Sequence, residues 1–284
     1  MLGARPARRD PLKVTVLGSG SRGNAVLVEG GTTRLLVDAG FAAREIERRL
    51  RAVGVEPEDL TGVWITHEHR DHTIGMGVLA RRFGLPLYLT EGTRRACHAL
   101  LNGCDRVHLY RPTHAVAVGD LRVEPFLTAH DAVDPVAVAV TEITTGHRVG
   151  LATDVGAPTA GVRHALRGCH VLILEANHDE VLLRDGPYPA SVRARIAGQR
   201  GHLSNQAAAR LAAELHHPAL AAVVLAHLSR ECNAPALAQD AVRRALRAVG
   251  YRGALLTAGQ NEPLEPLNVA ECLRQMRPAQ LTLW

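Results

Sequence analysis

Three histidines and an aspartate stand within six residues of this chain, at a spacing that suits metal binding. They are His67, His69, Asp71 and His72. Imidazole and carboxylate groups are ligands for zinc, manganese or iron. On an extended backbone, residues two apart point to the same side, so His67 and His69 can bind one ion while Glu68 points away. A helix beginning near Asp71 would turn Asp71 and His72 toward a second ion. The alternative is a solvated polar turn.

The apolar run Gly62–Thr66 directly precedes this cluster and predicts a short buried strand. Other histidines and aspartates that could bind a metal ion or support its ligands also follow apolar runs that predict strands. They are Asp38 after Leu35–Val37, His130 after Leu121–Leu127, Asp154 after Arg148–Leu151 and His227 after Leu220–Ala226. Strand ends at one edge of a sheet converge, so we expect these residues to meet around the cluster. Any one of them alone would more often be a satisfied polar residue. Asp38 is either a loop cap or the group that holds a ligand imidazole in the correct tautomer.

The remaining pattern predicts a single domain over residues 1–284, with residues 1–10 flexible and no internal repeat. Further strands are expected at Leu12–Leu17, Asn24–Glu29, Leu85–Leu89, Val116–Val118, Val136–Ile143, Val171–Leu174 and Ala254–Thr257, the last strand. Helices are expected at Arg44–Val53, Gly75–Phe83, Gly92–Leu101, Ser204–His216 and Ala236–Ala248, with Ser204 as an N-cap.

A glycine-rich loop, Gly18-Ser19-Gly20-Ser21-Arg22-Gly23, follows the first predicted strand. It matches the G-x-G-x-x-G fingerprint of dinucleotide-binding folds, which requires a helix next. The chain instead continues into a predicted strand, so the dinucleotide interpretation fails. The loop's backbone N–H groups and Arg22 can cradle a phosphate, and a plain tight turn is the equal alternative.

The composition is that of an ordinary globular protein of 284 residues, 46% hydrophobic and 21% charged. No apolar run reaches the about 18–20 residues that span a bilayer, and no secretory signal opens the chain. We therefore expect a cytoplasmic protein with no membrane partner. Five scattered cysteines, none in a C-x-x-C pair, argue against a zinc knuckle or a disulfide framework. A net charge of +5 favours an anionic partner. Genomic base composition is the other explanation, since Lys13 is the one lysine among 33 basic residues.

The motif His67-x-His69-x-Asp71-His72, with the later single residues His130, Asp154 and His227, resembles the metallo-β-lactamase-fold hydrolases. That resemblance implies an α/β fold, an αβ/βα sandwich of two mixed β-sheets flanked by helices. It also implies two divalent ions, manganese or zinc. His67, His69 and His130 would hold the first, and Asp71, His72 and His227 the second. Asp154 would bridge them, and Asp38 takes the family's preceding acidic position.

Finer features resemble the WalJ/YycJ-type bacterial nuclease branch of that family. They are Gly18–Asn24, Thr128–Ala132, Asp134-Pro135, Glu175–Asp179, Gly186–Pro189 and Gly201–Asn205. Members of this branch are described as DNA exonucleases acting from the 5′ end. The resemblance implies a single-stranded DNA substrate and a role in DNA repair. The more distant RNase Z and RNase J enzymes cut RNA, and this chain is too short for the inserted domain of the RNase J type.

The expected mechanism is two-metal hydrolysis, with ions about 3.5–4 Å apart that share a hydroxide and neutralise the scissile phosphate. Asp71 is expected to be catalytic as a ligand. His178 is the expected general acid, with a phosphate contact or a structural histidine as alternatives. The expected substrate contacts are Ser19, Ser21, Arg22, Asn177 and His202.

The basic segment Arg184–Ser204 also suits a phosphate backbone, with a solvated face as its alternative. Phe126 and Tyr188 are the aromatic residues nearest to the motifs, so strong base stacking is not expected. Three other functions stay open. One is a small-molecule thioesterase or lactonase of the glyoxalase II kind, another an RNA-processing nuclease. The third is a metal-binding regulatory protein without turnover, which the complete ligand set disfavours.

Overall fold

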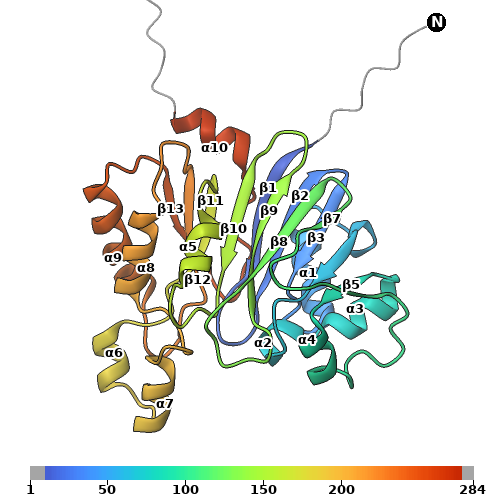
Figure 1. Cartoon of the computed structure of the whole chain (residues 1–284), viewed down its shortest axis with the longest axis horizontal. Helices are drawn as coiled ribbons and strands as arrows, with labels where there is room; N and C mark the ends of the chain where they lie inside the picture. Colours follow the sequence, from blue (N-terminus) through green and yellow to red (C-terminus); the bar gives the residue numbers. More distant parts are fainter. Residues whose placement is uncertain (1–9, 277–284) are drawn as a thin grey trace, which may run out of the picture.

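Two β-sheets pack face to face and carry helices on their outer sides (Figure 1). The computed structural model describes residues 10–276. Residues 1–10 were expected to be flexible, and all of them except Asp10 lie outside the described range. In spatial order, the strands of the first sheet are β14 (Leu267–Asn268), β1 (Asp10–Gly18), β2 (Ala25–Gly31), β3 (Thr33–Val37), β4 (Gly62–Trp64), β5 (Leu87–Leu89) and β6 (Val107–Leu109).

The second sheet repeats the same plan. In spatial order its strands are β13 (Ala254–Thr257), β12 (Ala222–Ala226), β11 (Val171–Glu175), β10 (Arg148–Ala152), β9 (Val136–Glu142), β8 (Leu121–Leu127) and β7 (Val116–Val118). Pairing is parallel from β3 to β6 and from β10 to β13, and antiparallel elsewhere. Strands β11 and β12 are buried along their whole length, as central parallel strands covered on both faces must be.

Helices cover both outer faces and both ends of the sandwich. They are α1 (Ala43–Ala52), α2 (Arg70–Thr73), α3 (Met76–Phe83), α4 (Glu91–Ala96), α5 (Ala160–Leu166), α6 (Glu180–Asp185), α7 (Ala190–Ile196), α8 (Asn205–Glu214), α9 (Pro235–Ala248) and α10 (Val269–Met276), with a 3₁₀ turn at Pro57–Asp59. Helices α1 and α3 lie beside the first sheet, and α8 and α9 beside the second (Figure 1). Helix α10 lies at one end, and α6 and α7 protrude at the other (Figure 1).

Aliphatic residues fill three layers of core, one between the sheets and one under each helical layer. In the central layer, Trp64 stacks on Tyr110 and Tyr88, with ring centroids 4.1 and 5.8 Å away. On the outside of the first sheet, α1 buries Ile46 and Leu50 and exposes Arg44, Arg48 and Arg51, as an amphipathic helix does. None of the helices between residues 10 and 276 combines the length and apolar character that a membrane crossing requires.

The expected sandwich of two mixed sheets is confirmed, and every strand and helix predicted from the sequence is present. Two details of the predicted elements were wrong. Ala254–Thr257 is not the last strand, because the two-residue β14 follows and pairs antiparallel with β1. The helix expected over Gly92–Leu101 ends at Ala96. Only Thr93 of that helix is buried, so little packing stabilises a longer one.

Within each sheet the pairing directions place several carboxyl ends at one edge: β1, β3 and β4 in the first sheet, and β8, β10, β11 and β12 in the second. His67 after β4 lies with His130 after β8 and Asp154 after β10, so these two edges are on the same side of the sandwich. The loops that follow these strands therefore meet at that edge.

Candidate metal centre

All seven predicted ligands lie together at this edge. Their ligand atoms form three groups, each with its atoms within 4.8 Å of one another: His67 with His69 and His130; Asp71 with His72 and His227; and His67 with His72 and Asp154. Four of these residues follow the first sheet's β4, and the other three follow strands of the second sheet. The pocket is therefore assembled from both sheets.

Asp154 lies between the two predicted ion positions. Its Oδ2 is 3.1 Å from Nε2 of His72, and its Oδ1 is 3.6 Å from Nε2 of His130. On the other side, Oδ2 of Asp71 lies 3.5 Å from Nε2 of His227 and 3.6 Å from Nε2 of His72. This geometry fits Asp154 as a bridging carboxylate and Asp71 as a ligand of one ion.

The backbone is strained at two of these ligands, Asp154 and His227, and at Asp38, which supports a third ligand. Asp38, Asp154 and His227 have φ angles of 62°, 59° and 54°, and Thr113 is the only other non-glycine residue with a positive φ between residues 10 and 276. This left-handed conformation costs about 1–3 kcal/mol and persists only where the surrounding structure holds it. Each of the three follows a strand within one or two residues. The turn there aims the side chain sideways into the pocket.

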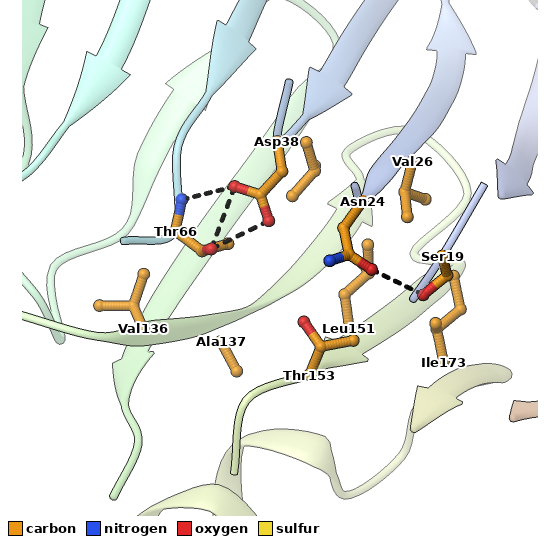
Figure 2. Close-up of a pocket in the computed structure, with 11 residues that line it drawn as sticks. Ser19, Asn24, Val26, Asp38, Thr66, Val136, Ala137, Leu151, Thr153 and Ile173 are labelled. Carbon is orange, nitrogen blue, oxygen red and sulfur yellow. Dashed lines mark hydrogen bonds between the residues drawn. The ribbon is translucent and has the colours of Figure 1, made fainter. Parts of the chain in front are cut away.

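Asp38 orients two histidines at once. Its carboxylate accepts hydrogen bonds from the backbone N–H and the hydroxyl of Thr66, at 2.8 and 2.9 Å (Figure 2). It also accepts one from Nδ1 of His72 at 2.7 Å. The Thr66 hydroxyl in turn lies 3.0 Å from Nδ1 of His67. With both Nδ1 atoms occupied, the Nε2 atoms of His67 and His72 are available to an ion.

Glu175 has the corresponding role on the second sheet, and no role was predicted for it from the sequence. It is fully buried, and its Oε1 accepts from Nδ1 of His227 (2.7 Å) and Nδ1 of His202 (2.8 Å). Its Oε2 accepts from the backbone N–H groups of Val155 and Leu203. Burial alone would raise the pKa of Glu175, but the two histidines lower it to about 2. Its position at the end of an apolar strand, like that of Asp38, was the available signal.

The donor set fits divalent cations. Nε2 of the buried His67 has no hydrogen-bond partner within the described residues. Burial holds the pKa of His67 well below its ordinary value, which keeps this imidazole neutral as a ligand must be. Burial also opposes the charged form of His72 and His227, but Asp154 and the other carboxylates outweigh it and raise both pKa values. The pocket thus attracts positive charge, as a metal site should.

His178, the expected general acid, is not brought to the pocket. It is 3% exposed and is absent from the residues that line the pocket in front of the ligands. Burial also lowers its pKa, which favours the neutral form. His202, by contrast, lines that pocket, and Glu175 outweighs the effect of burial to raise its pKa.

The other predicted substrate contacts divide into two groups. Ser21 and Arg22 are exposed, and Ser21 lines the pocket of about 230 Å³ in front of the ligands. Ser19 and Asn177 are largely buried and support the strained backbone of His227, and Asn177 also lines the pocket in front of the ligands. The hydroxyl of Ser19 accepts a hydrogen bond from the backbone N–H of His227 (2.9 Å), and the side-chain amide of Asn177 donates one to the backbone carbonyl of His227 (2.9 Å).

A small internal cavity of about 20 Å³ lies between the sheets (Figure 2). Figure 2 shows Asn24 and Thr153 pointing toward one another across it, with Ser19 bound to Asn24. It is far too small to hold a substrate.

Most arginines of the predicted basic segment are already engaged within the protein. Arg184 pairs with Asp185, Arg195 with Asp131, and Arg200 donates to the carbonyl of His130. The contacts of Arg195 and Arg200 tie α7 and the segment after it to the loop that carries His130. Of the two aromatic residues, Phe126 is buried in the core, whereas Tyr188 lines the pocket.

Comparison with known proteins gives a consistent picture. The family model of the metallo-beta-lactamase superfamily matches residues 18–164. Exodeoxyribonuclease YycJ of Bacillus anthracis is 34% identical over 84% of this chain and 91% of its own length. Exodeoxyribonuclease WalJ of Streptococcus pneumoniae is 35% identical over 80% and 85%. The crystal structure of the metallo-beta-lactamase-fold protein YhfI from Bacillus subtilis covers 90% of this chain and 99% of its own, with a TM-score of 0.67 and 22% identity.

Proposed function

Since this chain belongs to the metallo-beta-lactamase superfamily and, within it, to the group of the YycJ and WalJ exodeoxyribonucleases, we propose that it removes nucleotides from an end of a DNA strand. The chain is a metal-dependent hydrolase of the nuclease type. Single-stranded DNA as the substrate, attack from the 5′ end, two ions of manganese or zinc, and a role in DNA repair are further parts of the proposal.

One observation carries it. Side chains that follow strands of both sheets meet in one pocket, and this pocket also contains a histidine able to donate a proton. Hydrolysis of a phosphodiester needs groups that hold cations, because the phosphate is anionic. It also needs a proton donor, because the leaving sugar oxygen must be protonated.

His67, His69 and His130 would hold one ion, Asp71, His72 and His227 the other, and Asp154 would contact both. When bound, divalent ions lower the pKa of water and stabilise negative charge on phosphate oxygens. The chain's own groups fix the geometry: Asp38 orients His72, Glu175 orients His227, and the carbonyl of Gly201 accepts from Nδ1 of His130 (3.0 Å).

His202 is the proton donor that we propose in place of His178. Its Nδ1 is held by Glu175, its raised pKa favours the protonated form near neutral pH, and it lines the pocket where the leaving oxygen would lie. Glu175 bonds His202 and His227 with the same oxygen, so it aligns the proton donor with a metal ligand.

A substrate panel tests the function. Purified protein is incubated with single-stranded DNA, double-stranded DNA, RNA and a thioester, each with Mn²⁺ and with Zn²⁺. We expect single-stranded DNA to be degraded to mononucleotides, and the variant Asp71→Ala to lose this activity while its circular dichroism spectrum is unchanged. Asp105→Asn, which removes an exposed carboxylate outside the pocket, is the matched control. Cleavage of the thioester alone, with every nucleic acid intact, would refute the proposal.

The competing functions are less well supported. Ribonuclease Z of Mycobacterium avium is 31% identical, but over only 57% of this chain. A thioesterase of the glyoxalase II kind would use the same ligands, yet the relatives that cover most of the chain are exodeoxyribonucleases.

A further inference from the structure

A second pocket, of about 500 Å³, lies beside the metal centre. Its walls are the loops that follow β1, β12 and β13. Ser21 and Ser229 line both this pocket and the one in front of the ligands. The two spaces are therefore adjacent, so a ligand longer than one nucleotide could reach from one to the other.

The charged groups of this second pocket are two arginines, Arg22 and Arg230, and no carboxylate lines it. Both are exposed. Arg22 bonds only uncharged partners, such as Oδ1 of Asn261 at 3.3 Å, and Arg230 forms no ion pair within residues 10–276. By contrast, Arg195 pairs with Asp131 and Arg200 donates to the carbonyl of His130. Two arginines without an acidic partner on one pocket wall suit a phosphate group.

The amide side chains of the pocket serve its architecture. Gln260 accepts from the backbone N–H of Arg22 and donates to the carbonyl of Gly23. Arg49, which is 4% exposed, holds the carbonyl of Gln260 (3.0 Å) and that of Leu17 (2.7 Å). Gly20 leaves no room for a Cβ, which would lie 2.6 Å from Oε1 of Gln260. The wall is thus fixed before any ligand binds.

Part of the wall is apolar, from Leu228, Pro235 and Ala258, and the polar side chains of Ser229 and Asn233 also line the pocket. A pocket of this volume is of the size that small ligands occupy. The planar face of a nucleobase can lie on the apolar part of this wall. A cationic edge beside an apolar surface matches a nucleotide, whose phosphate is anionic and whose base has an apolar face.

We propose that this pocket binds the terminal nucleotide of the strand while the next phosphodiester lies at the metal centre. Arg22 and Arg230 contact its phosphate, and the apolar wall contacts its base. The proposal rests on the proposed function, since it places the strand end relative to the bond that is cut. It also makes the released mononucleotide a ligand of the same pocket.

Calorimetric titration of the full-length, metal-loaded protein with deoxyadenosine 5′-monophosphate tests this. We expect Arg230→Ala to weaken binding about tenfold, as loss of one charge-assisted hydrogen bond does. Arg244→Ala removes an exposed arginine of α9 that lies about 14 Å along the helix from Pro235, and it should bind like wild type. Deoxyribose 5-phosphate, which lacks the base, should bind more weakly than the nucleotide.

Equal affinity of the wild type and Arg230→Ala would overturn the proposal, because the nucleotide would then bind at the metal centre alone. Equal affinity for deoxyribose 5-phosphate and the nucleotide would also overturn it, because no base would be held. The titration needs no turnover. If Arg230→Ala leaves nucleotide binding unchanged and the wild type degrades DNA, the pocket proposal alone is refuted. If Arg230→Ala weakens nucleotide binding but the wild type does not cleave DNA, the proposed function alone is refuted.

Discussion

The substitution Asp38→Asn separates the support of the metal ligands from the fold. Asparagine has the size of aspartate and tolerates the left-handed backbone conformation found here, φ 62°. The change therefore removes the charge without adding backbone strain. The new amide group keeps the hydrogen bonds to Thr66 only if its oxygen faces Thr66. Its NH₂ group then faces Nδ1 of His72.

That arrangement favours the wrong tautomer of His72, with its proton on Nε2 and no lone pair for an ion. Loss of such an outer hydrogen-bond partner lowers metal affinity by about 10–100-fold, or about 1.4–2.7 kcal/mol. Asp38 also reaches His67 through the hydroxyl of Thr66, so we expect the larger end of this range. The assay is a competition titration of the metal-free protein against a chromophoric chelator, with Mn²⁺ and with Zn²⁺.

The variant Asp105→Asn carries the same charge change at an exposed position and should keep wild-type affinity. Thr66→Val keeps the bond from Asp38 to His72 and should show a smaller loss than Asp38→Asn. If Asp38→Asn folds like wild type by circular dichroism and binds both metals with unchanged affinity, the account of Asp38 is wrong.

Three further predictions concern catalysis and binding. His202→Asn should lower kcat about 10²–10⁴-fold with little change in KM, whereas the matched change His178→Asn should leave kcat within a few-fold; equal losses in steady-state assays would refute the assignment of the proton donor. Metal affinity should fall as pH is lowered, because protons compete for Nε2 of His72 and His227; their raised pKa values place the onset above 6.5, and a chelator titration between pH 5 and 9 measures it. Nuclease activity should weaken with added salt, because bound phosphates release counterions, and a KM for DNA that is independent of salt would contradict phosphate contacts by Arg22 and Arg230.

The sequence predicts the strands and the position of the site well, because both depend on strong local patterns. Apolar runs such as Val171–Leu174 and Leu220–Ala226 correspond to fully buried strands, so nearly every residue of the run is apolar and the strand is easy to recognise in the sequence. Each predicted ligand directly follows such a run or lies within a few residues of it. The direction of the strands then brings these ends to one edge.

What the sequence did not predict lacks a local pattern. Helix α7 buries no residue, so it has no apolar stripe, and β14 has only two residues. We propose His202 and not His178 as the proton donor because only the fold reveals that Glu175 holds His202 and that His178 is buried. The sequence could not separate the two, since each histidine stands next to a motif. Ser19, predicted to contact substrate, lines the second pocket, and its hydroxyl also supports the backbone of His227.

The order of the ligands along the chain also affects when the enzyme can act during its synthesis. The ribosome makes the first sheet's ligands early, but His227 follows β12, which must pair with β11 before it can deliver its histidine. A nascent chain that stops before β12 has an incomplete pocket. Newly made protein therefore cannot cut nucleic acid near the ribosome until most of its translation is finished.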